Sequence, residues 1–264
     1  MPTFIPAAAD QITKTVNGKR VSLLSKDAYA RFDTTLLGLG DLSQGSRSTD
    51  AIAAIFDLEG FTSFAKQIEP HLSVPLFLNE FLAWLMDALK KEMTKKQYRE
   101  GVELWCPLPF FVKFMGDGLL VLWDISKRGD IAKRNIVFSA HSICVDYGHS
   151  FLKRIRSKVT DPPMRLRCGL ACGTVFSVGN GADYVGSCIN MAARLQKIGG
   201  VTFAFNRRGF DLESPKIGEF FTQKITVKEM PIRGIGDHEL VALLKTEFES
   251  MKPKERNAIG IRDL

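Results

Sequence analysis

The chain has 264 residues, of which 45% are hydrophobic and 10% aromatic, and its 36 basic and 29 acidic side chains give a formal net charge of +7. This composition excludes an intrinsically disordered chain, which lacks the apolar residues needed to build a core. It also excludes a collagen-like chain, because the 22 glycines follow no regular period. The length allows one large domain or two small ones.

Neither membrane insertion nor secretion is predicted. No apolar run approaches the roughly 20 residues that cross a bilayer, and the N-terminus lacks the charged head and continuous apolar stretch of a secretion signal. The odd number of cysteines, five in all, favours buried reduced thiols over a disulfide framework. Cys168 and Cys172 are close in sequence, but a zinc site would need further soft ligands nearby. We therefore expect a cytoplasmic protein with no membrane partner.

Three segments are expected along the chain. Residues 1–49 are mixed in composition and end in a stretch rich in Gly and Ser, which predicts an N-terminal helical lead and linker. The catalytic or binding domain is expected over residues 50–250. Residues 251–264 are expected to form a C-terminal tail.

The first half of this domain alternates strand and helix signals. Residues 51–58 form a short apolar run bounded by Asp and Gly, which is typical of a buried strand. From residue 61 to residue 95, apolar side chains recur at helical spacing. Two further apolar runs flank Gly116-Asp117-Gly118, which is a strong signal for a β-hairpin.

The second half continues the same alternation. Helices are predicted over residues 131–157 and 185–198, the second ended by Gly199-Gly200. Strands are predicted between and after them, over residues 164–173, 174–179, 201–205, 218–227 and 239–244. The resulting β-α-β-β-α-β order predicts a ferredoxin-like α+β core with additional elements.

Two aspartates are expected to meet at one edge of this sheet. Asp57 closes the first buried strand, and Asp117 lies in the hairpin turn between the next two strands. Two carboxylates about 4 Å apart repel by roughly 4 kcal/mol at an effective dielectric constant of 20, so either one is protonated or a cation lies between them. Hard oxygen ligands in an open site suit Mg²⁺ or Mn²⁺. The alternative is that Asp57 caps a helix and Asp117 fills a turn.

The segment after Asp57 predicts an anion site. Gly60 allows a tight turn, and Phe61 and Thr62 would begin a helix, whose free N–H groups and dipole favour phosphate. A pair of metal-binding carboxylates beside such a site fits phosphoryl transfer.

Three motifs carry a resemblance to a known family. FDLEGFTSF, VKFMGDG and DYVGSCINMAARLQ, which begin at Phe56, Val112 and Asp183, resemble the motifs of the class III nucleotidyl cyclases, the family of adenylate and guanylate cyclase catalytic domains. They occur in the family's order and cover roughly residues 50–245. Each motif alone is weak evidence for the family, whereas all three in the family's order are specific evidence for it.

The resemblance implies a two-metal lyase. Asp57 and Asp117 match the family's metal-binding aspartates, with the carbonyl of Leu58 as a further ligand. Two divalent ions would hold a nucleoside triphosphate, and the ribose 3′-oxygen would attack the α-phosphorus and expel pyrophosphate. The product would be a 3′,5′-cyclic nucleotide.

The resemblance also implies a second group of site residues and a partner. Asn190 and Arg194 match the pair that orients the ribose and stabilises the transition state, and their spacing places both on one face of a helix. Arg233, in PIRGIGDHEL, lies where the family usually has a basic residue that reaches the triphosphate. In the family the metal aspartates and the Asn/Arg helix of one site come from different subunits, so a head-to-tail homodimer with two equivalent sites is implied.

The base is open between a pyrimidine and adenine. Lys113 and Asp183 match the family's base-reading positions in the combination associated with adenine, but the same donor and acceptor also suit cytosine and uracil. Phe56, Phe111 and Phe114 are bulky and would narrow the pocket toward a pyrimidine, unless they pack the core instead.

The architecture also favours a pyrimidine. The sequence carries an insertion, KKQYREGVELWCPLP, between the metal aspartates, and no sensor or signalling domain accompanies the catalytic domain. A domain of this kind resembles the prokaryotic cyclases that make cyclic UMP or cyclic CMP in antiphage defence. ATP, giving cyclic AMP, is the second candidate substrate.

Two other classes compete with an active cyclase. A catalytically inactive cyclase domain would serve as a nucleotide-binding module, but it would be expected to lack one of the motif residues, and all are present. A nucleic-acid-binding domain depends on the charge of +7 alone. We expect no nucleic-acid partner, because the basic clusters fall on predicted helix faces and turns.

Overall fold

The computed structural model describes residues 11–30, 33–67, 69–210 and 219–261. The chain divides into two compact units, which are described separately below. The smaller unit comprises residues 1–48 and 176–185, and the larger unit comprises residues 49–175 and 186–264.

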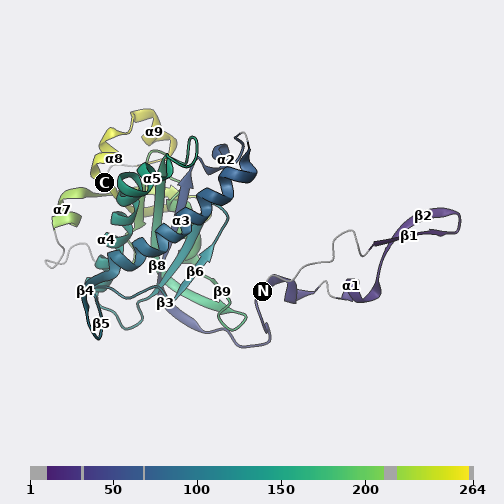
Figure 1. The fold of residues 1–264 in the computed structure, drawn as a ribbon. Coiled ribbons are helices and arrows are strands. Elements are labelled where there is room, and N and C mark those ends of the chain that lie inside the picture. Colours follow the sequence, from purple (N-terminus) through teal and green to yellow (C-terminus); the bar gives the residue numbers. More distant parts are fainter. Residues whose placement is uncertain (1–10, 31–32, 68, 211–218, 262–264) are drawn as a thin grey trace. The chain divides into compact units, whose positions relative to one another are not determined.

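The smaller unit begins with a β-hairpin rather than a helix. Strands β1 (Gln11–Val16) and β2 (Lys19–Leu24) pair antiparallel (Figure 1). Asn17 and Gly18 between them have φ of 50° and 74°, the left-handed conformations of the two-residue turn that suits twisted strands. The helical lead predicted for residues 1–49 is therefore wrong here, because an Asn-Gly turn flanked by β-branched residues favours strands.

The remainder of the smaller unit contains short elements. Helix α1 (Lys26–Ala30) and the single 3₁₀ turn η2 (Thr34–Leu37) follow β2. Strand β9 (Asp183–Val185) pairs antiparallel with residues 176–178. Ser177 is held by Arg47, whose N–H donates to the Ser177 hydroxyl at 2.9 Å and whose carbonyl accepts from the Ser177 N–H at 2.9 Å.

The larger unit is built on a mixed β-sheet. Seven strands lie in the order β11 (Ile225–Ile232), β12 (Gly236–Leu244), β10 (Phe203–Asn206), β8 (Arg165–Val178), β3 (Ser48–Glu59), β7 (Gly118–Asp124) and β6 (Phe111–Phe114). β10 runs parallel to β8, whereas the β3–β7 and β6–β7 pairs are antiparallel. The predicted α+β class is confirmed by this sheet and the helices that cover it.

Helices α3 (Pro70–Met93) and α4 (Asp130–Asp146) pack against each other and lie across one face of the sheet (Figure 1). A single π turn, η3 (Tyr147–Phe151), continues α4 into α5 (Leu152–Ile155). Aromatic rings fill the space between these helices, with Phe81 lying 6.2 Å from Tyr147 and 5.9 Å from Phe151 between ring centroids. Strand β3 supplies the centre of the core, because residues 51–58 are all buried.

Helix α3 is unusually long and apolar for a helix of this domain. By length and composition it would suffice to cross a membrane, although Glu80 and Asp87 interrupt its apolar residues, so it is no continuous apolar run. In the structure, Phe77, Phe81 and Trp84 of this helix point into the aromatic cluster of the core. Its apolar composition therefore serves packing within the larger unit.

Other element predictions need correction. Residues 164–179 do not form a pair of strands, because β8 runs without a turn from Arg165 to Val178. The helix predicted from residue 61 is interrupted between α2 (Phe61–Phe64) and α3, where Glu69 has a φ of 58° and Pro70 begins the new helix. Residue 218 lies outside the described residues, and the rest of the strand predicted over 218–227 starts as helix α7 (Glu219–Lys224).

Peripheral elements complete the larger unit. The insertion forms a separate two-stranded sheet of β4 (Thr94–Tyr98) and β5 (Gly101–Leu104). Two short helices follow the last strand of the sheet, α8 (Lys245–Ser250) and α9 (Pro253–Ala258).

We expect the stability of this core to depend on His141 at acid pH. The ring lies 5.3 Å from Phe203 and 4.9 Å from Phe220, and burial, with a smaller effect of Lys224, lowers the pKa of His141 from 6.5 to about 4. The unfolded chain therefore binds a proton between pH 6.5 and 4 that the folded chain excludes. The free energy of unfolding should fall by roughly 3 kcal/mol as the pH drops through this window.

Urea denaturation at pH 7 and at pH 4.5 measures this effect. His141→Gln should lose less stability between the two pH values than the parent. His149→Gln, at an exposed position of η3, is the matched control and should behave like the parent. An unchanged pH dependence in His141→Gln would contradict the assignment.

Candidate active site

The end of β3 and the β6–β7 hairpin bring the two predicted metal-binding aspartates to one edge of the sheet. Asp57 lies directly opposite Gly118 in the β3–β7 register, and the backbone N–H of Leu58 donates to the carbonyl of Asp117 at 3.1 Å. The hairpin closes where the Met115 N–H donates to the Gly118 carbonyl at 2.8 Å. Asp57 belongs to a strand and caps no helix, so the alternative prediction that Asp57 is a helix cap is wrong.

Gly118 allows this close approach. A Cβ on Gly118 would lie 2.0 Å from the carbonyl oxygen of Phe56, so the two strands could not keep their present separation. We expect Gly118→Ala to lower the free energy of unfolding by about 3 kcal/mol. Chemical denaturation would measure the loss, with Gly101→Ala as the control, because a Cβ on Gly101 would meet nothing within 4 Å. Equal stability of the two variants would contradict the proposed close packing.

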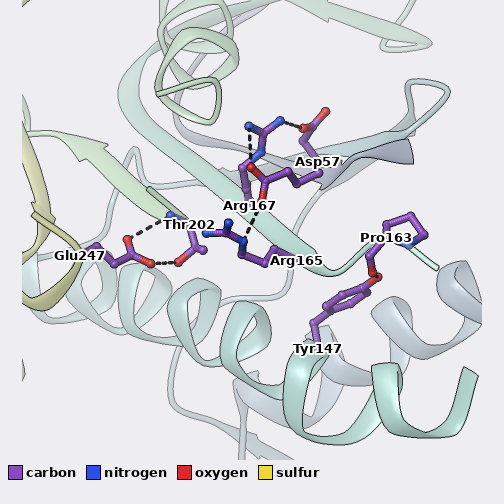
Figure 2. Close-up of polar contacts among 8 residues, drawn as sticks. Asp57, Tyr147, Pro163, Arg165, Arg167, Thr202 and Glu247 are labelled. Carbon is purple, nitrogen blue, oxygen red and sulfur yellow. Dashed lines mark hydrogen bonds and ion pairs between the residues drawn. The ribbon is translucent and has the colours of Figure 1, made fainter. Parts of the chain in front are cut away.

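Two arginines of β8 face the acidic end of β3 (Figure 2). Arg167 Nη2 donates to Asp57 Oδ2 at 2.6 Å, and Arg165 Nε pairs with Glu59 Oε2 at 2.8 Å. Arg167 Nη1 also lies 3.9 Å from Glu59 Oε1. Asp57 is only 8% exposed, and Arg167 compensates part of the cost of burying its charge.

Arg167 retains one unused donor. Among the described residues, its buried Nε has no hydrogen-bond partner. A buried N–H of a guanidinium without an acceptor is costly. The Arg167 guanidinium thus pairs with Asp57 and Glu59 at the cost of one buried, unpaired N–H.

Gly60, Phe61 and Thr62 form the turn after β3. Gly60 has a φ of 84°, and its carbonyl accepts from the N–H groups of Ser63 at 3.0 Å and Phe64 at 3.1 Å. The Thr62 side chain is exposed, and Phe61 is half-buried against the aromatic cluster. The predicted glycine turn into a helix is present, although the helix α2 is a single turn.

Helix α6 (Ser187–Leu195) presents Asn190 and Arg194 together on its exposed face. The opposite face packs on β8 at two glycines. A Cβ on Gly169 would lie 2.3 Å from the Ala192 carbonyl oxygen, and a Cβ on Gly173 would lie 3.0 Å from the Cys188 Cβ. These close contacts fix the direction in which the Asn/Arg face points.

Arg194 and Arg233 line a common groove of about 650 Å³. Lys197 adds a third positive charge, and Asp237 is the acidic residue of the lining. Neither Asp57 nor Asp117 lines this groove. Arg194 and Arg233 thus line a groove to which neither acid contributes.

The two predicted base-reading residues lie on different strands. Lys113 is exposed on β6, opposite Leu120 of β7. Asp183 belongs to the smaller unit, where its Oδ1 accepts from the Tyr184 N–H at 2.9 Å. Phe56 is fully buried in the core, so for this ring the core-packing alternative is confirmed.

Comparison with solved structures shows the fold. The guanylyl cyclase Cya2 aligns with a TM-score of 0.55 at 15% sequence identity, over 76% of this chain and 94% of that chain. The chain has the fold of a cyclase catalytic domain. The catalytic core of a rhodopsin-guanylyl cyclase with converted specificity, in complex with ATPαS, aligns at a TM-score of 0.49 and 16% identity, over 76% of this chain and 98% of that chain. No protein-family model matches the chain, and neither does any curated protein.

The end of β3 and the β6–β7 hairpin, called the acidic edge below, offer ligands that fit a hard divalent cation. Asp57, Asp117 and the Leu58 carbonyl offer only oxygen atoms, which suit Mg²⁺ or Mn²⁺. Within the described residues there is no group of three or more His, Cys, Asp or Glu side chains that could hold a metal. All five cysteines are free thiols.

Sequence reasoning missed Arg165, Arg167 and Glu59. In the sequence, Asp57 and Glu59 are two residues apart on β3, and the two arginines are two residues apart on β8. This spacing places the side chains of each pair on one face of their strand. The signal could not be interpreted from the sequence because nothing local shows that β3 and β8 are neighbours in the sheet.

Proposed function

We propose that the protein is a nucleotidyl cyclase, which converts a nucleoside triphosphate to a 3′,5′-cyclic nucleotide and pyrophosphate. The observation that supports this most strongly is the meeting of Asp57 and Asp117 at one sheet edge, joined by the Leu58 to Asp117 hydrogen bond of 3.1 Å. The three motifs of the sequence supply the remaining residues of such a site.

Each group of residues would have a separate task. Asp57, Asp117 and the Leu58 carbonyl would hold Mg²⁺ or Mn²⁺. The ions, when bound, neutralise the triphosphate and make the ribose 3′-hydroxyl more acidic. Arg167 would hold Asp57 in place beside the ions through its ion pair with the Asp57 carboxylate.

Asn190 and Arg194 would orient the ribose and stabilise charge on the reacting phosphate. Arg233 lines the same groove as Arg194 and would bind the outer phosphates. Because neither acid lines this groove, we propose a head-to-tail homodimer in which the acids of one chain complete the groove of the other.

A pyrimidine triphosphate is the proposed substrate, with ATP as the alternative. Lys113 and Asp183 would read the base, and their donor and acceptor suit all three candidates. Phe56 is buried in the core and does not narrow the base pocket. The bulk that favours a smaller base therefore comes from Phe111 and Phe114, which flank Lys113 in the sequence. The free thiols suit the reducing cytoplasm, where a cyclic nucleotide could act as an antiphage signal.

Incubation of the purified protein with Mn²⁺ and each of the four ribonucleoside triphosphates tests the proposal. We expect one cyclic nucleotide and pyrophosphate, identified by mass spectrometry. A product from ATP alone would exclude the pyrimidine assignment. No product from any of the four, with a folded dimer present, would contradict the cyclase proposal and leave a nucleotide-binding module.

A further inference from the structure

The C-terminal segment, residues 253–261, is folded back onto the larger unit. At its start the Lys252 N–H donates to Glu255 Oε2 at 2.8 Å, which caps α9. The Arg256 guanidinium stacks over the Phe248 ring at 4.4 Å, and its Nη2 donates to the Glu249 carbonyl at 3.0 Å. These contacts attach α9 to α8, so the segment is an ordered part of the domain.

The end of the segment is packed closely against the β11–β12 hairpin. Gly260 has a φ of 67°, and a Cβ at this position would lie 2.8 Å from Pro231 Cγ and 2.9 Å from Pro231 Cδ. The Gly260 N–H donates to the Asn257 carbonyl at 3.1 Å and closes the turn after α9. Only glycine allows the chain to approach Pro231 in this way.

This packing places the C-terminal segment in the lining of the groove that Arg194, Lys197 and Arg233 share, called the basic groove below. Asn257 and Ile259 line it together with Arg194 and Arg233. Lys197, one turn after Arg194, brings the positive charges of the lining to three against the single acid Asp237. The excess of positive charge suits an anionic ligand.

We infer that the C-terminal segment completes the polyphosphate-binding groove, with Lys197 and Asn257 as substrate-binding residues. This inference depends on the proposed function. Lys197 would add a positive charge next to Arg194, and the exposed Asn257 amide would donate to the same phosphates. Residues 253–261, which belong to the segment expected to be a tail, would then take part in substrate binding.

Calorimetric titration with inorganic tripolyphosphate, the part shared by all four substrates, tests the inference. We expect Lys197→Ala to raise the Kd about tenfold and Asn257→Ala about threefold. Gly260→Ala should also raise the Kd, because it displaces the C-terminal segment without removing a side chain that contacts tripolyphosphate. Lys254→Ala is the matched control, because this exposed lysine of α9 does not line the groove and its loss should change nothing.

The cyclase assay supplies a second readout. In Lys197→Ala and Asn257→Ala the KM should rise while kcat stays within about twofold of the parent, as expected for lost ground-state binding. Circular dichroism would show whether Gly260→Ala folds; if it does not, the other two variants decide. Parental Kd and KM values in both would overturn the inference.

Failure of the inference and failure of the proposed function are distinguishable. If the parent cyclises a nucleotide while both variants keep its KM, only the role of the C-terminal segment is wrong. If the parent cyclises nothing, the proposed function is wrong, and the tripolyphosphate titration alone then decides on the groove.

Discussion

Replacing Asp117 with Asn is expected to lower cyclase turnover about a thousandfold, which corresponds to a loss of roughly 4 kcal/mol of transition-state stabilisation. The amide is nearly the same size as the carboxylate but carries no charge, so it binds a divalent ion poorly. The backbone carbonyl of Asp117, which accepts from the Leu58 N–H, is unaffected by the change. The variant should therefore fold and dimerise like the parent.

The Asp117 experiment has a matched control on the same domain. Asp87→Asn removes an exposed carboxylate from α3, and turnover should remain that of the parent. Thermal unfolding of both variants checks that the loss does not come from destabilisation. If Asp117→Asn retained turnover within a few-fold of the parent, Asp117 would not belong to the site.

The acidic edge was predictable because its signals are local. An apolar run ending in Asp57 predicts a buried strand, and Gly-Asp-Gly between apolar runs predicts a hairpin. Gly118 then serves both the turn and the close approach to Phe56. Since each strand and its turn are encoded within a few residues, their pairing into one edge follows from the expected fold class.

The remainder of the site depends on pairings that no local pattern encodes. Arg167 reaches Asp57 across 110 positions of sequence, because β8 lies beside β3 in the sheet. Gly169 and Gly173 allow α6 to pack on β8, which is unbroken where two strands, 164–173 and 174–179, were predicted. The role of Gly260 is likewise visible only once Pro231 lies against it.

Mixing two inactive variants is expected to restore activity, if the sites are shared between chains. Asp57→Asn removes an acid but keeps an acceptor for the buried Arg167, and Arg194→Ala removes a groove residue. In a mixed dimer both changes fall in one site and the other site is intact. Random exchange of subunits should therefore restore about a quarter of the parental turnover.

The control for this mixture uses two changes on the same side of the site. Asp57→Asn mixed with Asp117→Asn should remain inactive, because every site in every dimer then lacks one acid. Mass spectrometry of the intact dimers confirms that subunits have exchanged. Exchange without recovery in the first mixture would place the acids and Arg194 of one site in a single chain, against the separation of the acids from the basic groove.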